Sequence, residues 1–181
     1  MTSVTEEDFD NAVKTVVENL SGVDSLYPAQ KEVLRSLVVD DDNLFVTAPT
    51  NSGKTLAPVM LPQVLNELNK LGYQFPTVPR VLFLTALNSI QLSLLSSLSS
   101  LGIDCAALTR ENVDQILSSE VPILLIGPET FKLPSVSKSL LNYRTSFVLK
   151  VVDEAHLGMY IISYSSVMFR PPNPNFCYEF L

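Results

Sequence analysis

One stretch of the sequence carries the residue types needed to hold a phosphate group. It runs from Ala48 to Thr55 and reads Ala-Pro-Thr-Asn-Ser-Gly-Lys-Thr, after an apolar run at 44–46 and before a helical pattern that starts at Leu56. In such a strand–loop–helix layout, successive backbone N–H groups point into the loop, and the helix N-terminus adds positive potential. The pattern indicates a phosphate-binding P-loop. The alternative is a chance Gly-Lys-Thr in an ordinary turn.

The residues of this loop have separate expected roles in binding ATP and Mg²⁺. Lys54 would reach the β- and γ-phosphates and assist catalysis, and the Thr55 hydroxyl would ligate Mg²⁺. The strict pattern has glycine where this chain has Ala48, and Asn51 replaces a second glycine. Asparagine is the next-best residue for a left-handed turn conformation. The further expected ATP contacts are Thr50, Asn51, Ser52 and Gly53.

A pair of carboxylates follows the last strongly apolar run, 147–152, in the sequence Asp153-Glu154-Ala155-His156. An aspartate at the carboxyl end of a strand beside the P-loop strand can hold Mg²⁺ through water. The adjacent glutamate can then orient and deprotonate the attacking water. We therefore expect Asp153 to bind the metal and Glu154 to act as the catalytic base, in a DEAH-type Walker B motif. A surface acidic turn is the alternative.

A third candidate site residue precedes the loop, in Leu26-Tyr27-Pro28-Ala29-Gln30. Proline suits the first position of a helix, which places Gln30 in the first turn of a helix that continues to about residue 39. A glutamine amide can donate to and accept from one adenine edge at once, and Tyr27 could stack on the same base. Taken alone, this stretch is also an ordinary helix start.

The elements that must position these residues alternate between helices and strands. Short apolar runs separated by helical patterns indicate a parallel sheet buried on both faces, in a doubly wound, three-layer α/β/α arrangement. The predicted strands are 44–46, 81–84, 103–108, 123–126 and 147–152. The predicted helices are 6–20, 28–39, 56–71, 87–101 and 111–119.

Three of these helices carry local predictions. Ser3 and Glu6 are spaced as a capping box at the start of the first helix. Pro58 and Pro62 would each remove a hydrogen bond from the helix after the loop, so we expect that helix to be kinked or shortened. Four leucines are predicted to share one face of the helix 87–101: Leu92, Leu95, Leu98 and Leu101.

Composition bounds the class of protein. At 181 residues and 46% hydrophobic, the chain suffices for one well-buried domain. No apolar run approaches the roughly 20 residues needed to span a bilayer, so we expect an intracellular protein without membrane contact. Cys105 and Cys177 suggest free thiols rather than a disulfide or metal site. The net charge of -7 argues against strong DNA backbone binding by the chain alone.

Together these residues resemble the superfamily 2 DNA helicases, and most closely the RecQ family, over about residues 20–156. The family's Phe-Arg-Pro-x-Gln element is similar to the stretch that ends in Gln30, with Tyr27 in place of the arginine that flanks adenine. The resemblance implies a RecA-like P-loop NTPase lobe, and ATP hydrolysis coupled to 3′–5′ DNA unwinding in the complete family. It further implies ATP, Mg²⁺ and DNA as partners, a coupling role for His156 and a nuclear location.

Two further family motifs imply contacts with nucleic acid. The stretch from Thr85 to Ser89, Thr-Ala-Leu-Asn-Ser, is similar to the family's motif after the second strand. The family's Thr-Pro-Glu element corresponds to Gly127-Pro128-Glu129, where the threonine hydroxyl is absent. By this resemblance, the expected nucleic-acid contacts are Thr85, Ser89, Pro128 and Glu129.

After His156 the resemblance ends. The chain has no tryptophan, whereas RecQ proteins continue with a Trp-containing aromatic-rich loop, and neither the second RecA-like lobe nor its arginine finger is matched. We therefore predict an N-terminal helix at 1–22, an incomplete ATP-binding lobe at 23–156, and a divergent tail with little order at 157–181. The chain alone should be inactive as a helicase and bind DNA weakly. It could work with a second lobe or a full-length relative. The alternatives are a non-catalytic nucleotide- or partner-binding fragment and a P-loop ATPase that does not act on nucleic acid.

Overall fold

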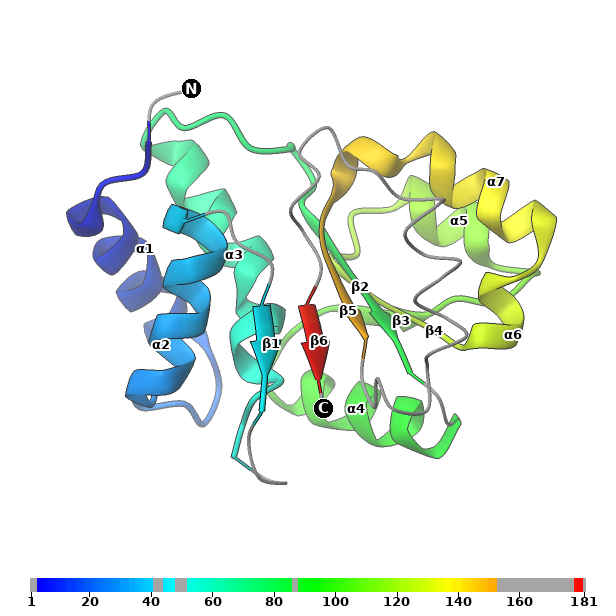
Figure 1. Ribbon diagram of the computed structural model, residues 1–181, viewed down its shortest axis with the longest axis horizontal. Coiled ribbons are helices and arrows are strands. Elements are labelled where there is room, and N and C mark those ends of the chain that lie inside the picture. Colours follow the sequence, from blue (N-terminus) through cyan, green and yellow to red (C-terminus); the bar gives the residue numbers. More distant parts are fainter. Residues whose placement is uncertain (1–2, 41–43, 48–51, 86–87, 153–177, 181) are drawn as a thin grey trace.

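The computed structural model describes residues 3–40, 44–47, 52–85, 88–152 and 178–180, and Figure 1 shows the arrangement of its elements. The strands are β1 (Leu44–Val46), β2 (Arg80–Leu84), β3 (Cys105–Ala107), β4 (Ile123–Ile126), β5 (Phe147–Val152) and β6 (Tyr178–Phe180). The α-helices are α1 (Glu6–Asn19), α2 (Pro28–Arg35), α3 (Leu56–Lys70), α4 (Asn88–Ser100), α5 (Val113–Ser118), α6 (Pro128–Phe131) and α7 (Pro134–Asn142). A π-helical turn, η1 (Ser36–Asp40), extends α2, and a 3-10 turn, η2 (Arg144–Ser146), precedes β5.

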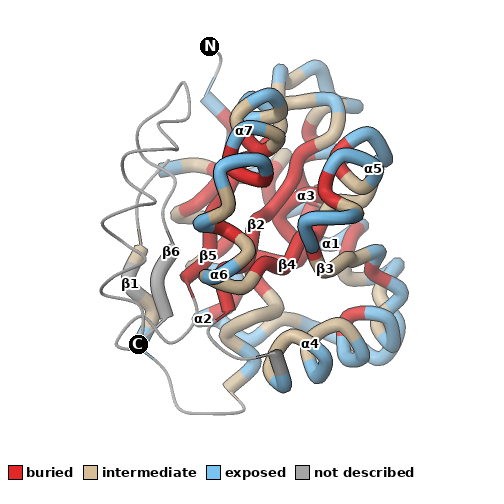
Figure 2. The backbone as a smooth tube through the Cα atoms, turned by 90° about the vertical axis from the view of Figure 1, so that its right-hand side faces the viewer, coloured by how far each residue is buried: buried red, intermediate tan, exposed pale blue. Residues whose placement is uncertain are grey.

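The strands form one sheet in the order β1-β6-β5-β2-β4-β3, and every neighbouring pair is parallel. Strands β2, β4 and β5 are buried along their whole length, which fits a parallel sheet covered on both faces. In Figure 2 the buried residues concentrate in these strands and on the inner sides of the helices. The predicted strand ranges 44–46, 123–126 and 147–152 are confirmed.

Two hydrophobic cores lie on the two faces of the sheet. Along β2 and β4, alternate side chains join opposite cores, as the two-residue repeat of a strand requires. Val81 and Phe83 belong to the core under α1, α2, α3 and α4, whereas Leu82 and Leu84 belong to the core under α5, α6 and α7. The molecule is therefore a doubly wound α/β/α sandwich, as the sequence predicted.

The position of β6 differs from expectation. We predicted that the strand before Asp153 lies beside the strand before the phosphate loop. In the structure β6 lies between them, pairing with β1 on one side and β5 on the other. Residues 178–180, from the segment predicted as a divergent tail, thus lie within the sheet itself. The proposed domain limits stay a prediction.

Helix α3 keeps its full length despite its two prolines. It runs from Leu56 to Lys70, in agreement with the predicted range 56–71, so of the two predicted effects the shortening does not occur and the kink stays a prediction. Pro58 is the third residue of the helix, where the backbone N–H has no intrahelical acceptor in any case. Pro62 lies inside the helix and is buried, so its apolar ring contributes to the core while it removes one hydrogen bond.

The cap of α1 is also not the one predicted. Thr5, rather than Ser3, is the N-cap, and its hydroxyl accepts the Asp8 N–H at 3.1 Å. The Asp8 carboxylate accepts from the Tyr73 hydroxyl at 2.7 Å and from the Thr5 hydroxyl at 2.8 Å. These two hydrogen bonds favour the charged form, so they lower the pKa of Asp8. The bond from Tyr73 ties the start of α1 to the chain after α3.

Replacing Tyr73 with phenylalanine should raise the pKa of Asp8, since the hydrogen bond that lowers this pKa most is lost. Because the folded-state pKa is depressed, this bond stabilises the protein above the unfolded pKa of about 3.9, and the benefit is lost as the pH falls through the folded pKa. NMR titration of the Asp8 carboxyl carbon in wild type and Tyr73→Phe measures the change. Tyr143→Phe serves as the control. An unchanged titration of Asp8 in Tyr73→Phe would contradict the assignment.

Candidate nucleotide-binding site

The described part of the phosphate loop, residues 52–55, lies between β1 and the start of α3, as the sequence predicted. Gly53 has φ 71, in the left-handed region that favours glycine. Its carbonyl accepts the Leu56 N–H at 3.0 Å, which closes the turn into the helix. Thr55 is the N-cap of α3. Thr50 and Asn51 lie outside the described residues.

Gln30 contacts the phosphate loop directly. Its side chain is buried, and the amide nitrogen donates to the Gly53 carbonyl at 3.0 Å. At its other end the amide oxygen accepts the Tyr27 N–H at 2.9 Å, which satisfies one free donor at the start of α2. A Cβ on residue 53 would collide with the Gln30 amide nitrogen. Helix α2 and the phosphate loop are therefore joined through one side chain.

This bridge bears on the predicted contact with adenine. In the structure each end of the Gln30 amide already has a protein partner, so an adenine edge would use the remaining N–H and the remaining lone pair. The Tyr27 side chain is 69% exposed beside it, which leaves its ring free of protein cover for stacking on a base. The adenine contact stays a prediction, and the bridge to Gly53 is a role that the sequence analysis missed.

The described residues of the loop fit a nucleotide phosphate and its cation. Ser52 Oγ is buried and has no hydrogen-bond partner among the residues that the structure describes, so the loop holds an unused polar atom. Gly53 has no side chain to obstruct an approaching phosphate, and Lys54 and Thr55 are only partly buried. An ammonium group and a hydroxyl are the chemical types that a phosphate and Mg²⁺ need at this position.

The second half of the predicted site follows β5. Asp153, Glu154 and His156 lie outside the described residues. Strand β5 ends at Val152, directly before them, and β1 ends at Val46, before the phosphate loop. Because both strands run in the same direction in one sheet, the two motifs leave from the same edge. Within the ranges described, no cluster of His, Cys, Asp and Glu could hold a metal ion.

The four predicted nucleic-acid contacts lie at the same edge of the sheet but differ in exposure. Thr85, at the end of β2, is only 1% exposed, and its N–H donates to the Ile126 carbonyl at 3.1 Å. A direct contact through the Thr85 side chain would therefore need a rearrangement around it. Ser89 and Glu129 are exposed, and Pro128 is half-buried at the start of α6. These roles stay predictions.

The fold and the site together define a class. A doubly wound parallel sheet with a phosphate loop between β1 and α3 is the architecture of an α/β P-loop NTPase. In overall fold the chain is similar to the UvsW helicase of bacteriophage T4, with a TM-score of 0.63, 14% sequence identity and coverage of 99% of this chain and 60% of that one. A second UvsW structure gives a TM-score of 0.65 at 17% identity, and this chain covers 34% of it. These likenesses show a RecA-like α/β fold.

Sequence comparison identifies the family. Residues 27–165 match the DEAD/DEAH box helicase family, and the chain belongs to that family. It is 33% identical over 162 residues to the ATP-dependent DNA helicase Hel308 of Thermococcus kodakarensis, covering 85% of this chain and 13% of that protein. Hel308 of Pyrococcus horikoshii is 30% identical, with 85% and 21% covered. The chain thus spans about a fifth or less of the length of these curated relatives.

No described helix is long and apolar enough to cross a bilayer.

Proposed function

We propose that this chain is the ATP-binding first lobe of an ATP-dependent DNA helicase. The observation that carries the proposal is the bond from Gln30 to Gly53, which joins the residue expected to read adenine to the loop expected to hold phosphate. Membership of the DEAD/DEAH box family supports it, as do the curated relatives, which are named ATP-dependent DNA helicases.

In this proposal each residue of the site has one task. Lys54 and the loop N–H groups bind the β- and γ-phosphates, and Thr55 with Asp153 holds Mg²⁺. Gln30 and Tyr27 orient the base. ATP would be the phosphoryl donor, with ADP as the leaving group, and a bound Mg²⁺ would neutralise charge on the phosphates. Glu154 takes the proton of the attacking water. His156 links the site to movement of the lobes.

The narrower assignment to a RecQ-like helicase with 3′–5′ polarity also belongs to the proposal. It rests on the spacing of Pro28 and Gln30 and on the Asp-Glu-Ala-His sequence that begins at Asp153. The relatives named above are Hel308 helicases, so they support a DNA helicase without supporting the RecQ subfamily.

The proposal predicts Mg²⁺-dependent ATP binding that requires Lys54. Lys54→Ala should weaken binding at least tenfold, because a hydrogen bond to a charged group contributes about 1.5–3 kcal/mol and 1.4 kcal/mol is a factor of ten. Titration of a fluorescent ATP analogue in the presence of Mg²⁺ measures the affinity of each variant.

A matched control lies at the other end of the same helix. Lys70 is exposed and pairs with Glu67 at 2.7 Å, one turn back along α3. Lys70→Ala removes the same charge at the helix end farthest from the loop, so it should bind the analogue as wild type does. Equal affinities for wild type and Lys54→Ala would overturn the proposed function.

A further inference from the structure

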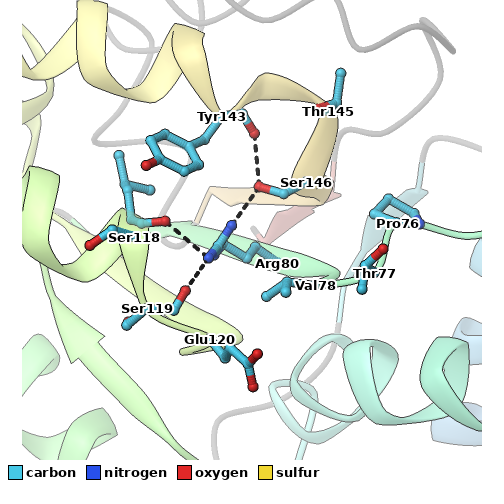
Figure 3. Close-up of a pocket in the computed structure, with 11 residues that line it drawn as sticks. Pro76, Thr77, Val78, Arg80, Ser118, Ser119, Glu120, Tyr143, Thr145 and Ser146 are labelled. Carbon is cyan, nitrogen blue, oxygen red and sulfur yellow. Dashed lines mark hydrogen bonds between the residues drawn. The ribbon is translucent and has the colours of Figure 1, made fainter.

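A buried arginine lies at the opposite edge of the sheet from the phosphate loop. Arg80 is the first residue of β2, and its side chain is 3% exposed. One terminal nitrogen donates to Ser146 Oγ at 2.8 Å, and the other donates to the carbonyls of Leu117, at 3.1 Å, and Ser119. Figure 3 shows the guanidinium between the end of α5 and the turn before β5. Arg80 thus fastens three elements together.

The charge of Arg80 is incompletely compensated. Among the residues described, no carboxylate forms an ion pair with it, and its Nε–H is buried without a hydrogen-bond acceptor. Burial lowers the pKa of Arg80, because removal from water disfavours the charged form. The Tyr143 ring, with its centroid 5.7 Å from the guanidinium carbon, and the Glu120 carboxylate, which is not in ion-pair contact, both favour the cation. Arg80 lines a pocket and has no direct ion pair among the residues described, so an anion bound there would supply the contact charge that it lacks.

A pocket of about 540 Å³ opens onto this arginine. Its size falls in the roughly 300–1,000 Å³ range of small-molecule sites. Apolar walls come from Pro76, Val78 and Tyr143, and Thr145 lines it as well. The Ser146 hydroxyl at the pocket accepts from Arg80 and donates to the Tyr143 carbonyl at 2.8 Å. The site therefore offers one charged donor, a few polar groups and an apolar body.

We propose that this pocket binds a small organic monocarboxylate, whose charge pairs with Arg80 and whose apolar or aromatic part lies against Tyr143 and Val78. The Glu120 carboxylate also lines the pocket, and the chain carries a net charge of -7, so a polyphosphate or other polyanion is disfavoured. Arg80 and Ser146 stand at the amino ends of β2 and β5, whereas the phosphate loop follows the carboxyl end of β1. The pocket is separate from the nucleotide site and does not depend on the proposed function.

Benzoate is a suitable probe, with benzamide as its neutral counterpart of the same shape. Titration of the isotope-labelled 181-residue chain, followed by NMR, would report the Arg80 Nε–H signal and the backbone signals of Ser119 and Thr145. Benzoate should shift these three signals with a millimolar dissociation constant, as one buried charge pair in a small pocket allows. Benzamide should bind at least tenfold more weakly.

Two variants test the site independently, so that the conclusion does not depend on a variant with altered folding. Arg80→Gln removes the charge and should abolish the difference between benzoate and benzamide. Because this variant also loses bonds that fasten α5, Thr77→Trp provides an independent test: Thr77 is exposed, lines the pocket and leaves Arg80 intact. It should weaken benzoate binding at least tenfold by filling the pocket. Thr15→Trp, on the exposed side of α1, is the matched control and should bind as wild type does.

Three outcomes would overturn the proposal. The first is an absence of shifts at 20 mM benzoate, taken as about twenty times a millimolar dissociation constant. The second is equal binding of benzoate and benzamide, which would show an apolar pocket that ignores charge. The third is benzoate binding that Thr77→Trp leaves unchanged, which would place the ligand elsewhere. In each case Arg80 would have only a structural role, in which it joins β2 to the end of α5 and to the turn before β5.

Discussion

Leu98→Ala should lower the free energy of unfolding by about 2–5 kcal/mol, whereas Leu92→Ala on the same helix should change it by less than about 0.5 kcal/mol. Leu98 is 2% exposed and belongs to the core between α4 and the sheet, while Leu92 is 69% exposed. Removing Leu98 deletes buried methyl groups and leaves a cavity that the packed strands cannot fully close. Removing Leu92 deletes surface that is already in water.

Urea unfolding curves for the two variants measure this difference, since both exchange the same residue types in the same helix. Thermal unfolding should agree, at roughly 2–4 °C of Tm for each kcal/mol in a chain of this size. Equal destabilisation by the two substitutions would mean that α4 packs through a different face. It would contradict the packing of α4 against the core that contains Leu98.

The contrast between these leucines shows where sequence reasoning about helices stops. Four leucines at three-residue steps were predicted to share one face of this helix, and the prediction did not say which of them are buried: Leu98 is 2% exposed and Leu92 69%. Spacing identifies residues that share a stripe of the helix, but three-residue steps drift around an axis with 3.6 residues per turn. Only contact with the sheet decides which part of the stripe is covered, and that contact involves residues distant in sequence.

The strands were predicted well because their signal is local. Continuous apolar runs such as 123–126 and 147–152 are typical of strands buried on both faces, and the structure confirms both ranges. Strand β6 was missed because its three residues follow a proline-rich stretch and carry no such run. Its place in the sheet comes from pairing with β1 and β5, which lie far away along the chain.

Helices α6 and α7 were missed for a different reason. Each begins with a proline at its first position, Pro128 and Pro134, which is a recognised start signal. Pro128 was interpreted only as part of the motif Gly127-Pro128-Glu129, and no element was predicted between 129 and 146, so the signal was not used. Phe131 and Val136 are nevertheless buried, and they anchor these two short helices on the sheet face opposite α3.

The two segments of the candidate site could be predicted from the sequence, but the hydrogen bond that joins them could not. The loop around Lys54 and the helix start around Gln30 each had a local pattern. The bond between Gln30 and Gly53 spans 23 residues of sequence, and no pattern in either segment announces it. It also gives Gly53 a second reason to be glycine, beyond the shape of the loop.

Gly53→Ala should therefore lose nucleotide affinity about tenfold or more, with a loss of stability in addition. A left-handed conformation costs a residue with a Cβ about 1–2 kcal/mol. At this position the Cβ would also displace the Gln30 amide nitrogen and break its bond to the loop, which adds about 0.5–1.5 kcal/mol. The loop would lose its link to α2, so the base and phosphate contacts would no longer be held together.

Gly22→Ala separates the cost of the left-handed backbone from the cost of the collision with Gln30. Gly22 has nearly the same backbone angle, with φ 74 against 71, and open space where its Cβ would lie. It should lose stability by the strain alone and bind the fluorescent ATP analogue as wild type does. Urea unfolding gives the stability of each variant, and titration with the analogue gives its affinity.

A double-mutant cycle with Gln30→Ala completes the test, because neighbouring residues that act together are not additive. Truncating Gln30 removes the group with which the new Cβ collides. The double variant Gln30→Ala/Gly53→Ala should therefore lose less affinity than the sum of the two single losses. Strict additivity, or an affinity in Gly53→Ala equal to that in Gly22→Ala, would show that the bridge has no part in holding the nucleotide. In that case the loop would bind phosphate independently of α2.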